Sequence, residues 1–387
     1  MKGLTTGIVL CTLSASVSAQ PEYTVVDLGS FGGDIAAVDI NDAGVVVGWG
    51  VVNRFDYQMF RYDGVLTAIA PLQPQTQAQA TLASVDGSVV GAGYSMTDLD
   101  RDALVSDGVN TVSPGMFTPT GSDSSGRLVG ITPVTLANGF VIEHACEYSD
   151  GTLSVLPLLP GGADSAAFDT DDSGWIVGGA FPAGALKPTP ALWVAQTPTN
   201  LGTLGGTGGQ AHAINNARQV VGWANTAAGQ PHAFRYNLSG SGAVTSRTDL
   251  GTLDGKASHA RDINDAGEVV GTSGSHAFIY RSGQMIDLNS LIDPASGWVL
   301  VDAKAINNAG QIVGHGSIPG HPLRAFLLEP GVCLADTNGD GVLSPADFSA
   351  WVVAFNNAAP ACDQNGDGNC TPADFSAWIA NYNAGCQ

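Results

Sequence analysis

The chain contains, at residues 260–271, the stretch ARDINDAGEVVG, in which two short strand-like segments flank the turn Asn264-Asp265-Ala266-Gly267. Asn, Asp and Gly favour turns because they tolerate left-handed backbone and hydrogen-bond their own chain. The segment after the turn is apolar on successive residues, which is typical of a strand covered on both faces. Further strand-like segments at residues 276–280 and 284–288 complete a unit of four strands.

This unit occurs seven times between residues 27 and 328. Its clearest marker is a pair of aliphatic residues followed by a glycine, and these glycines are Gly48, Gly91, Gly130, Gly178, Gly222, Gly271 and Gly314. Successive marker glycines are 39 to 49 residues apart, and a strand-rich repeat of this length is typical of propeller blades. Unit five has Arg218 where the turn glycine is expected, so we expect a strained or differently shaped turn there.

The order of the strands predicts how the ring closes. Unit seven ends with a strand at residues 324–328, and Pro330-Gly331 follows in place of a fourth strand. One unpaired strand, YTVVDLG at residues 23–29, precedes the first unit and matches Asp249-Leu250-Gly251 further along the chain. We therefore predict an all-β, seven-bladed β-propeller over residues 20–330, in which residues 23–29 complete the last blade and remove an exposed sheet edge.

The third strand of the unit carries a short recurring motif. It reads His232-Ala233-Phe234 and His276-Ala277-Phe278, with Arg324-Ala325-Phe326 and His144-Ala145-Cys146 as departures. The unit resembles the HAF repeat of secreted bacterial proteins, most closely in units five to seven. The resemblance implies an extracellular repeat architecture and little about activity.

Charge and the N-terminal segment limit the possible partners and compartment. The net charge is −21 and the chain has four lysines, which argues against a nucleic-acid or anionic-membrane partner, since both require clustered positive charge. Residues 1–19 have the pattern of a signal peptide: Lys2, a short apolar core and Val17-Ser18-Ala19 before Gln20. No later apolar run approaches the length of a membrane span. We expect a secreted, extracellular protein that is either free or attached to a cell surface by something other than a membrane helix.

Two copies of one loop lie near the C-terminus, at residues 336–347 and 363–374. Oxygen-bearing side chains recur at positions 1, 3, 5 and 12, with glycine at position 6, and a backbone carbonyl serves position 7. This spacing suits a hard cation with six to eight oxygen ligands. We therefore predict two Ca²⁺ ions, held by Asp336, Asn338, Asp340, Val342 (carbonyl) and Asp347, and by Asp363, Asn365, Asp367, Asn369 (carbonyl) and Asp374.

Each loop is followed by an amphipathic helix that opens with Pro-Ala-Asp-Phe-Ser-Ala-Trp. Two such short helices must pack on each other, and a segment of this size needs metal or disulfides to fold. Four cysteines lie in the last 55 residues: Cys333, Cys362, Cys370 and Cys386. In an oxidising compartment they predict two disulfides, with three possible pairings, of which we favour Cys333–Cys386 with Cys362–Cys370. Zinc is the alternative, but the spacing has no CxxC.

Residues 331–387 form the expected second domain, and the part from residue 333 resembles a type I dockerin of the cysteine-bracketed variety. Asp347 and Asp374 at position 12, where an EF-hand carries Glu, carry this resemblance. It implies calcium-dependent attachment to a cohesin-like module or another scaffold or cell-surface protein. Positions 10 and 11 depart from the family, with Pro345-Ala346 and Pro372-Ala373, so the identity of the partner stays open.

The propeller sequence has no catalytic signature such as GxSxG, HExxH or a phosphate loop. Asp39, Asp169 and Asp262 share one column of the first strand. They form either a carboxylate cluster in the channel or, as we favour, hydrogen bonds to the turn that follows each of them. Five tryptophans are either sugar-stacking platforms or, as we favour, core residues: Trp49, Trp175, Trp193, Trp223 and Trp298. Cys146 is expected to be a buried apolar residue.

Two functions fit these features. The first is a non-catalytic, exported propeller that displays a binding surface, with a glycan as a candidate ligand, and is tethered through its calcium-binding tail. The second is a polysaccharide-active enzyme, a glycoside hydrolase or lyase, that is attached by the same tail. The second rests on the company that dockerins keep, which is an analogy and not chemistry.

Overall fold

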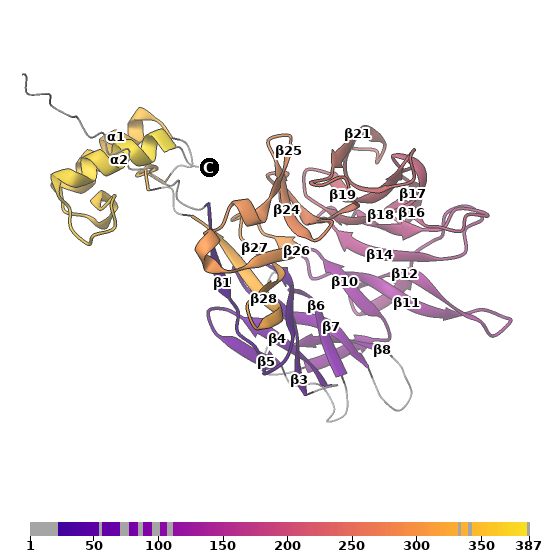
Figure 1. The fold of residues 1–387 in the computed structure, drawn as a ribbon. Coiled ribbons are helices and arrows are strands. Elements are labelled where there is room, and N and C mark those ends of the chain that lie inside the picture. The colour runs from indigo at the N-terminus through magenta and orange to yellow at the C-terminus, as the bar shows by residue number, and fades with distance from the viewer. Residues whose placement is uncertain are drawn as a thin grey trace, which may run out of the picture. The chain divides into compact units, whose positions relative to one another are not determined.

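The computed structural model describes residues 22–53, 56–69, 77–83, 88–94, 101–106, 111–331, 334–339 and 343–384. The chain divides into a β-rich unit, Tyr23–Pro330, and a second unit that contains Gly331–Gln387. The expected signal peptide, residues 1–19, lies outside the described residues. Figure 1 shows the sheets of the first unit and the two helices of the second. The predicted all-β propeller with a small helical domain after it is thus the fold of the chain.

The propeller consists of seven antiparallel sheets of four strands. Sheets 1 to 4 are, strand by strand: β2 Ile35–Ile40, β3 Val46–Asn53, β4 Asp56–Tyr62, β5 Leu66–Ile69; β6 Gln77–Ala83, β7 Val89–Tyr94, β8 Arg101–Ser106, β9 Thr111–Gly115; β10 Thr118–Ser122, β11 Leu128–Thr135, β12 Val141–Ser149, β13 Thr152–Val155; β14 Ser165–Thr170, β15 Ile176–Ala180, β16 Thr189–Val194, β17 Thr197–Asn200. Sheets 5 to 7 are: β18 Gly205–Ile214, β19 Gln219–Thr226, β20 Pro231–Leu238, β21 Val244–Gly251; β22 Ser258–Ile263, β23 Val269–Ser273, β24 His276–Arg281, β25 Gln284–Asp287; β26 Val299–Ile306, β27 Ile312–Ile318, β28 His321–Pro330, β1 Tyr23–Asp27. Two 3-10 turns, η1 Leu288–Ser290 and η2 Pro294–Ser296, connect sheets 6 and 7.

The ring closes as the sequence predicted, with the N-terminal strand β1 added to sheet 7. β1 pairs with β28 from Tyr23 opposite Pro330 to Asp27 opposite Phe326. Each sheet packs against the next along the chain, and β2 of sheet 1 packs against β27 and β28 of sheet 7. In Figure 1 the indigo β1 accordingly lies beside the orange β28. β1 therefore supplies the fourth strand of sheet 7 and covers the edge of β28.

The marker glycines are explained by a bulge in the first strand of every sheet. The register between first and second strands shifts at the same place in all seven sheets, for example between Ala167 and Asp169 in sheet 4. The marker glycine pairs with the residue before the shift, as Gly178 does with Ala167. A Cβ on Gly178 would overlap the carbonyl oxygen of Ala166. Six of the seven marker glycines show this overlap, so the bulge requires a glycine opposite it.

The second strands are buried on both faces, as predicted. All five residues of β15 are buried, and the hydrophobic clusters are formed between neighbouring sheets. Cys146 is buried and unpaired, which agrees with its expected apolar role. Arg218 has φ +61°, so the turn without its glycine does adopt a left-handed conformation.

The tail contains two helices, α1 Pro345–Asn356 and α2 Pro372–Ala384, with the 3-10 turn η3 Pro360–Cys362 between them. Ser344 caps α1 and Pro345 occupies its first position. Asp347 completes a capping box with Ser344. Among the residues that the structure describes, no helix has the length and apolarity that a membrane crossing requires.

Candidate functional site

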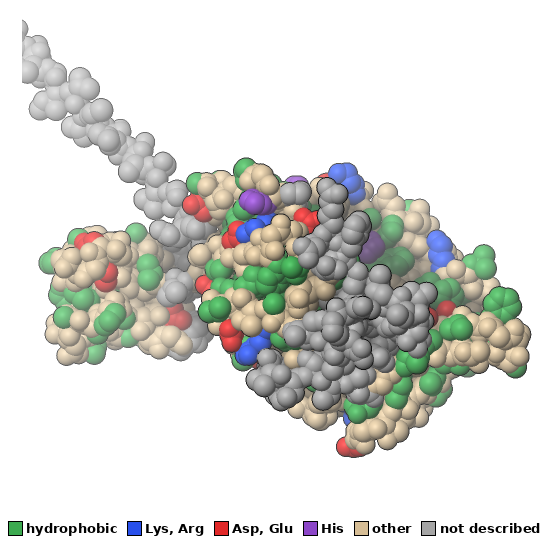
Figure 2. Space-filling model, turned by 90° about the horizontal axis from the view of Figure 1, so that it is seen from below, with side chains coloured by type: hydrophobic (Ala, Val, Ile, Leu, Met, Phe, Trp, Pro, Cys, Tyr) green, Lys and Arg blue, Asp and Glu red, His purple; other side chains and the backbone are tan. Residues whose placement is uncertain are grey.

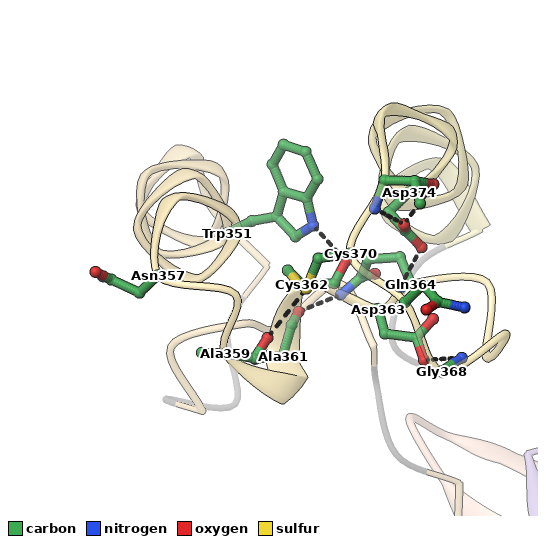
Figure 3. The surroundings of a disulfide bond; sticks show 12 residues. Trp351, Asn357, Ala359, Ala361, Cys362, Asp363, Gln364, Gly368, Cys370 and Asp374 are labelled. Carbon is green, nitrogen blue, oxygen red and sulfur yellow. Dashed lines mark hydrogen bonds between the residues drawn. A yellow bond between two sulfur atoms is a disulfide. The ribbon is translucent and has the colours of Figure 1, made fainter.

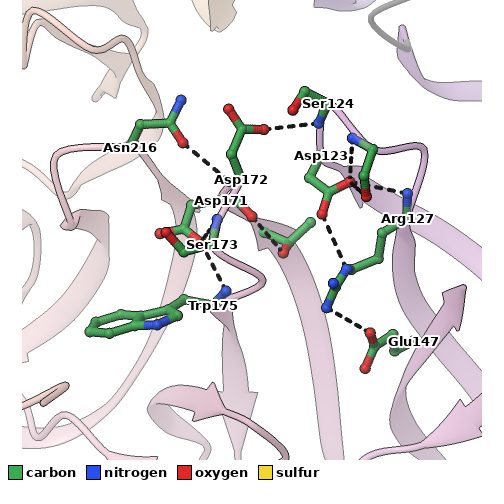
Figure 4. Close-up of polar contacts among 11 residues, drawn as sticks. Asp123, Ser124, Arg127, Glu147, Asp171, Asp172, Ser173, Trp175 and Asn216 are labelled. Atoms are coloured by element: carbon green, nitrogen blue, oxygen red, sulfur yellow. Dashed lines mark hydrogen bonds and ion pairs between the residues drawn. The ribbon is translucent and has the colours of Figure 1, made fainter. Parts of the chain in front are cut away.

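A cavity of about 410 Å³ lies among the first strands of the propeller sheets and the turns that follow them. Within the described residues, six first strands contribute to its lining: β2, β10, β14, β18, β22 and β26. The lining is mainly polar and rich in Asp and Asn. Figure 4 shows polar contacts at the turns of sheets 3 and 4, among them those of the lining residues Asp123, Ser124, Asp171 and Asp172.

Asp39, Asp169 and Asp262 all line this cavity, which agrees with the less favoured of the two interpretations of their shared column. Asp262 Oδ1 does accept from the N–H of Ile263, just before the turn that follows it, at 2.7 Å, but further hydrogen bonds reach the next sheet. Asp169 Oδ2 accepts from the N–H of Ile214 in the next sheet at 2.9 Å, and Asp262 Oδ2 accepts from the N–H of Ile306 in the next sheet at 2.8 Å. These carboxylates therefore tie neighbouring sheets together.

The pKa values of these carboxyl groups follow from their surroundings. Burial raises the pKa of Asp169 well above its ordinary value, and the charges of Asp262 and Asp39 raise it further. Burial also raises the pKa of Asp262 to about 6. The cavity thus holds acidic groups that take up protons more readily than exposed ones.

A row of polar residues surrounds the cavity at the second position of the six turns that the structure describes, those of sheets 1 and 3 to 7. The N–H of this residue donates to the side chain of its counterpart in the next sheet, from Ser124 to Asp172, Asp172 to Asn216, Asn216 to Asp265, Asp265 to Asn308 and Asn308 to Asp42. These hydrogen bonds between turns were not predicted from the sequence. The signal was present, since the second turn position is Asp or Asn in five of these six turns.

His212 also lies in the cavity wall, and its role is structural. Its Nδ1 lies 2.8 Å from the carbonyl oxygen of Ala260 in the next sheet, and its ring meets Phe168 edge-on at 5.7 Å. Burial lowers the pKa of His212 to about 4. The ring is therefore neutral near pH 7 and donates its Nδ1–H to that carbonyl.

The recurring histidine of the third strand pairs with an aspartate of the fourth strand. His232 Nδ1 lies 2.9 Å from Asp249, and His276 Nδ1 lies 2.6 Å from Asp287. Where the motif departs to arginine in sheet 7, Arg324 contacts both oxygens of Asp27 at 2.7 and 2.8 Å. Asp27 belongs to β1, so the repeated pair also joins the N-terminal strand to the ring.

Of the five tryptophans, Trp175 and Trp193 are buried, in agreement with the core interpretation. The other three are partly buried against aromatic neighbours, and Trp223 lies 5.3 Å from the ring of His259. His259 borders a second cavity of about 510 Å³, together with Lys256, Arg261, Thr272 and Ser275. Figure 2 shows Lys and Arg side chains scattered over the drawn face, with no basic patch among the described residues.

In the tail, the two aspartates at position 12 are completely buried and bind their own loops. Asp374 Oδ1 accepts from the N–H groups of Gln364 at 2.9 Å and Asn365 at 3.2 Å, and its Oδ2 accepts from Thr371 N–H at 2.7 Å. Asp347 accepts in the same way from Asn338 and Ser344. These hydrogen bonds, the one from Thr371 first, lower the pKa of Asp374.

The first position of the second loop is also enclosed by backbone donors. Asp363 Oδ1 accepts from Gly366 and Asp367, and its Oδ2 accepts from Gly368 at 2.8 Å (Figure 3). In the first loop, Asp336 accepts from Gly339. The predicted ligands Asp340 and Val342 lie outside the described residues. Among the described residues, no three His, Cys, Asp or Glu side chains are gathered closely enough to hold a metal, so calcium stays a prediction.

A disulfide joins Cys362 and Cys370, the inner pairing favoured from the sequence, with Cα atoms 5.6 Å apart (Figure 3). Cys333 and Cys386, the other favoured pair, lie outside the described residues. Trp351 Nε1 donates to the carbonyl oxygen of Cys362 at 3.2 Å. The segment that carries the disulfide therefore packs against α1.

The helices pack through equivalent aromatic residues. Phe348 lies 5.8 Å from Phe375 and 5.2 Å from Trp378, and Trp351 lies 5.6 Å from Phe375. Phe348 and Trp351 are the counterparts of Phe375 and Trp378, so these contacts agree with the prediction that the two helices pack on each other. Phe348, Phe375 and Ile379 are nevertheless about 40% exposed.

The chain matches no family model and no curated protein sequence. Solved structures share its fold at low identity. A streptogramin B lyase is 10% identical with a TM-score of 0.51, and the match covers 80% of this chain and 98% of that one. The propeller domain of the Trilobed protease from Pyrococcus furiosus is 10% identical with a TM-score of 0.50, covering 67% and 86%. The Pyrococcus horikoshii acylaminoacyl peptidase is 11% identical with a TM-score of 0.50, covering 76% and 51%. At these identities the likeness shows the β-propeller fold alone.

Proposed function

We propose that this chain is an exported, non-catalytic propeller that presents a binding surface and is tethered to a scaffold or cell-surface protein by a calcium-dependent tail. The observation that carries the proposal is the pair of equivalent loop–helix units, each with a buried aspartate at position 12 that is hydrogen-bonded back to its own loop. This duplication is the feature by which the tail resembles dockerins.

The loops supply the donor set that calcium prefers. In the second loop, Asp363, Asn365, Asp367 and Asp374 offer side-chain oxygens and Asn369 offers a carbonyl. Backbone N–H groups already fix the carboxylates of Asp363 and Asp374. A bound Ca²⁺ would offset the repulsion among these carboxylates, and the chain's own residues would hold the loop in place around it.

The tail also presents apolar side chains at its surface. On α1, Val353 is 60% exposed and Phe348 is 38% exposed, and on α2 Phe375 and Ile379 are each 41% exposed. Figure 2 shows hydrophobic side chains at the surface of the tail. Such exposure in a small domain supports a role in binding a protein partner, here a cohesin-like or other scaffold module.

The propeller geometry favours binding over catalysis. Asp169 and Asp262, the best candidates for acid–base work, each use a carboxylate oxygen to tie adjacent sheets. The second cavity, by contrast, offers Lys256, His259 and Arg261 beside the partly buried Trp223. An aromatic ring next to hydrogen-bond donors is a suitable arrangement for a sugar, so we propose a glycan as the ligand of the propeller.

The first test is calcium binding by the full oxidised chain, measured by equilibrium dialysis and calorimetry. We expect two ions per chain, and the double variant Asp336→Ala/Asp363→Ala should bind neither. Asp150→Asn removes an exposed carboxylate outside the loops and should leave uptake unchanged. Undiminished uptake in the double variant would refute the ligand assignment.

The second test is capture of the partner from a cell envelope on the immobilised full chain, with and without a calcium chelator. We expect capture that requires calcium and is lost in Val353→Glu/Ile379→Glu, because each substitution places a charge at an exposed apolar position of its helix. The variant must still bind two calcium ions for its failure to count. Calcium-independent capture would contradict the tethering mechanism.

A further inference from the structure

A repeated asparagine links successive propeller sheets. It is the first residue of the turn, and its Nδ2 donates to the backbone carbonyl of the equivalent residue in the next sheet. Asn215 contacts Asn264 in this way at 2.8 Å, Asn264 contacts Asn307 at 3.3 Å, and Asn307 contacts Asn41 at 3.0 Å. The last contact joins sheet 7 to sheet 1. A side-chain donor at this position therefore holds the contact between neighbouring sheets.

The residue four positions after this asparagine is a hydrogen-bond partner for its side chain. Behind each asparagine of this series is an acceptor for its Nδ2: Gln219 for Asn215, Glu268 for Asn264 and Gln311 for Asn307. In sheet 3 the first residue is Asp123, and the fourth after it is Arg127, whose Nε lies 3.1 Å from Asp123 Oδ2 (Figure 4). An aspartate at this position is thus accompanied by a cationic donor.

Asp171 in sheet 4 breaks this match. Its Oδ1 accepts from the N–H groups of Ser173 and Trp175, each at 2.9 Å. Its Oδ2 is buried and has no hydrogen-bond partner among the described residues, because Trp175 stands where sheet 3 has Arg127. The residue is only 3% exposed. An ionised carboxylate oxygen in this place would be left unpaired at considerable cost.

Charged groups near Asp171 are already engaged elsewhere. Arg218, from the turn of sheet 5, stacks over the Trp175 ring at 4.9 Å. Arg127, from sheet 3, pairs with Asp123 and with Glu147. On its own turn, Asp172 adds a second negative charge next in sequence. Burial raises the pKa of Asp171, and the backbone donors and Arg218 offset this only in part.

We propose that Asp171 is held as the neutral carboxylic acid, with its Oδ2–H donating to the carbonyl oxygen of Asn215. The proton then takes the place that the amide Nδ2 occupies in the asparagine-bearing sheets. The contact between sheets 4 and 5 is consequently held by a proton and weakens when that proton is lost at higher pH.

The substitution Asp171→Asn tests this directly, because an amide supplies the donor permanently and keeps the Oδ1 acceptor. A group whose pKa is raised by folding stabilises the protein at low pH, and that stability is lost as the pH rises through the folded-state pKa. The melting temperatures of the full-length variant and the wild type should therefore agree at about pH 3.5, below the pKa of about 3.9 of an aspartate in the unfolded chain, and the variant should exceed the wild type by about 2–4 °C at pH 8–9. Titration of Asp169 and Asp262 is common to both proteins and cancels in the difference.

Two matched substitutions give the opposite sign. Asp123→Asn removes the partner of Arg127 and should lower the melting temperature at every pH. Asn264→Asp places a second carboxyl group beside Glu268 and should lower it increasingly as the pH rises. Infrared difference spectra of wild type minus Asp171→Asn at pH 7 should show a protonated carboxyl stretch. A pH-independent difference for Asp171→Asn, or the absence of that band, overturns the proposal.

Discussion

The propeller and the tail reach stability by different means. In the propeller, each sheet repeats the same small features, a bulge with its glycine and polar contacts to the next sheet. The free energy of unfolding is therefore distributed over many similar contacts. In the tail, a few groups carry most of the order: two buried aspartates, one disulfide and a small aromatic cluster. The difference teaches that repetition makes a fold tolerant of single changes, whereas a small domain depends on individual polar groups.

The largest expected effect is an exception to that tolerance, the removal of β1. Deleting residues 22–30 leaves β28 with an unpaired edge and removes the buried Tyr23 and Leu28. An exposed edge next to apolar surface promotes aggregation, so we expect the full chain without this segment to be insoluble. Solubility after expression and size-exclusion chromatography measure the effect.

The same strand supplied from another place is the control. A permuted chain in which residues 22–30 follow Pro330 through a short linker should recover a soluble monomer, because β1 can then pair with β28 from the other end. If the deletion variant is itself monomeric and melts as the parent does, β1 does not close the ring.

The next effect concerns the tail. Asp374→Ala leaves the N–H groups of Gln364, Asn365 and Thr371 without their acceptor. We expect the helical tail to unfold while the propeller keeps its own calorimetric transition. Limited proteolysis should then cut within residues 334–384 only. Cleavage in the propeller, or a tail that stays resistant, would show that the two units do not differ as described.

The sequence predicted the features that follow from its repeat and from counting the strands of each unit. The turn at residues 264–267 and the marker glycines indicated the repeat, and the unpaired strand at residues 23–29 indicated the closure. The disulfide Cys362–Cys370 belongs to the favoured one of the three possible pairings of the four cysteines. The hydrogen bonds between neighbouring sheets were not predicted. Asp169 and Ile214, for example, are 45 residues apart and belong to different sheets. The alternation of Asp169 and Asp262 with the small Ala213 and Ala305 in one column was the signal.

A moderate effect is expected from the marker glycine of sheet 4. In Gly178→Ala the new methyl group overlaps the backbone oxygen of Ala166, so β14 must shift, at about 1–3 kcal/mol of unfolding free energy. Gly179→Ala is the matched control, because its methyl group would meet mainly the flexible side chain of Gln210 at 3.1 Å. Denaturant unfolding followed by tryptophan fluorescence compares the two. Equal losses for both variants would contradict the role assigned to the bulge.

The smallest effects are expected for the repeated side-chain pairs of the third strand, and they allow two sheets of the propeller to be compared. The His276 side chain is 49% exposed, so breaking its pair with Asp287 in His276→Ala should cost less than about 0.5 kcal/mol. Arg324 is 12% exposed and contacts both oxygens of Asp27, so Arg324→Ala should cost about 1 kcal/mol. Double-mutant cycles with Asp287→Ala and Asp27→Ala separate the pair energies from the loss of packing. Of these two pairs, the Arg324–Asp27 pair links the N-terminal strand to the ring. Its loss should therefore also speed unfolding, whereas the loss of the His276–Asp287 pair should not. Equal coupling energies would mean that the closing sheet is held by its strand pairing alone.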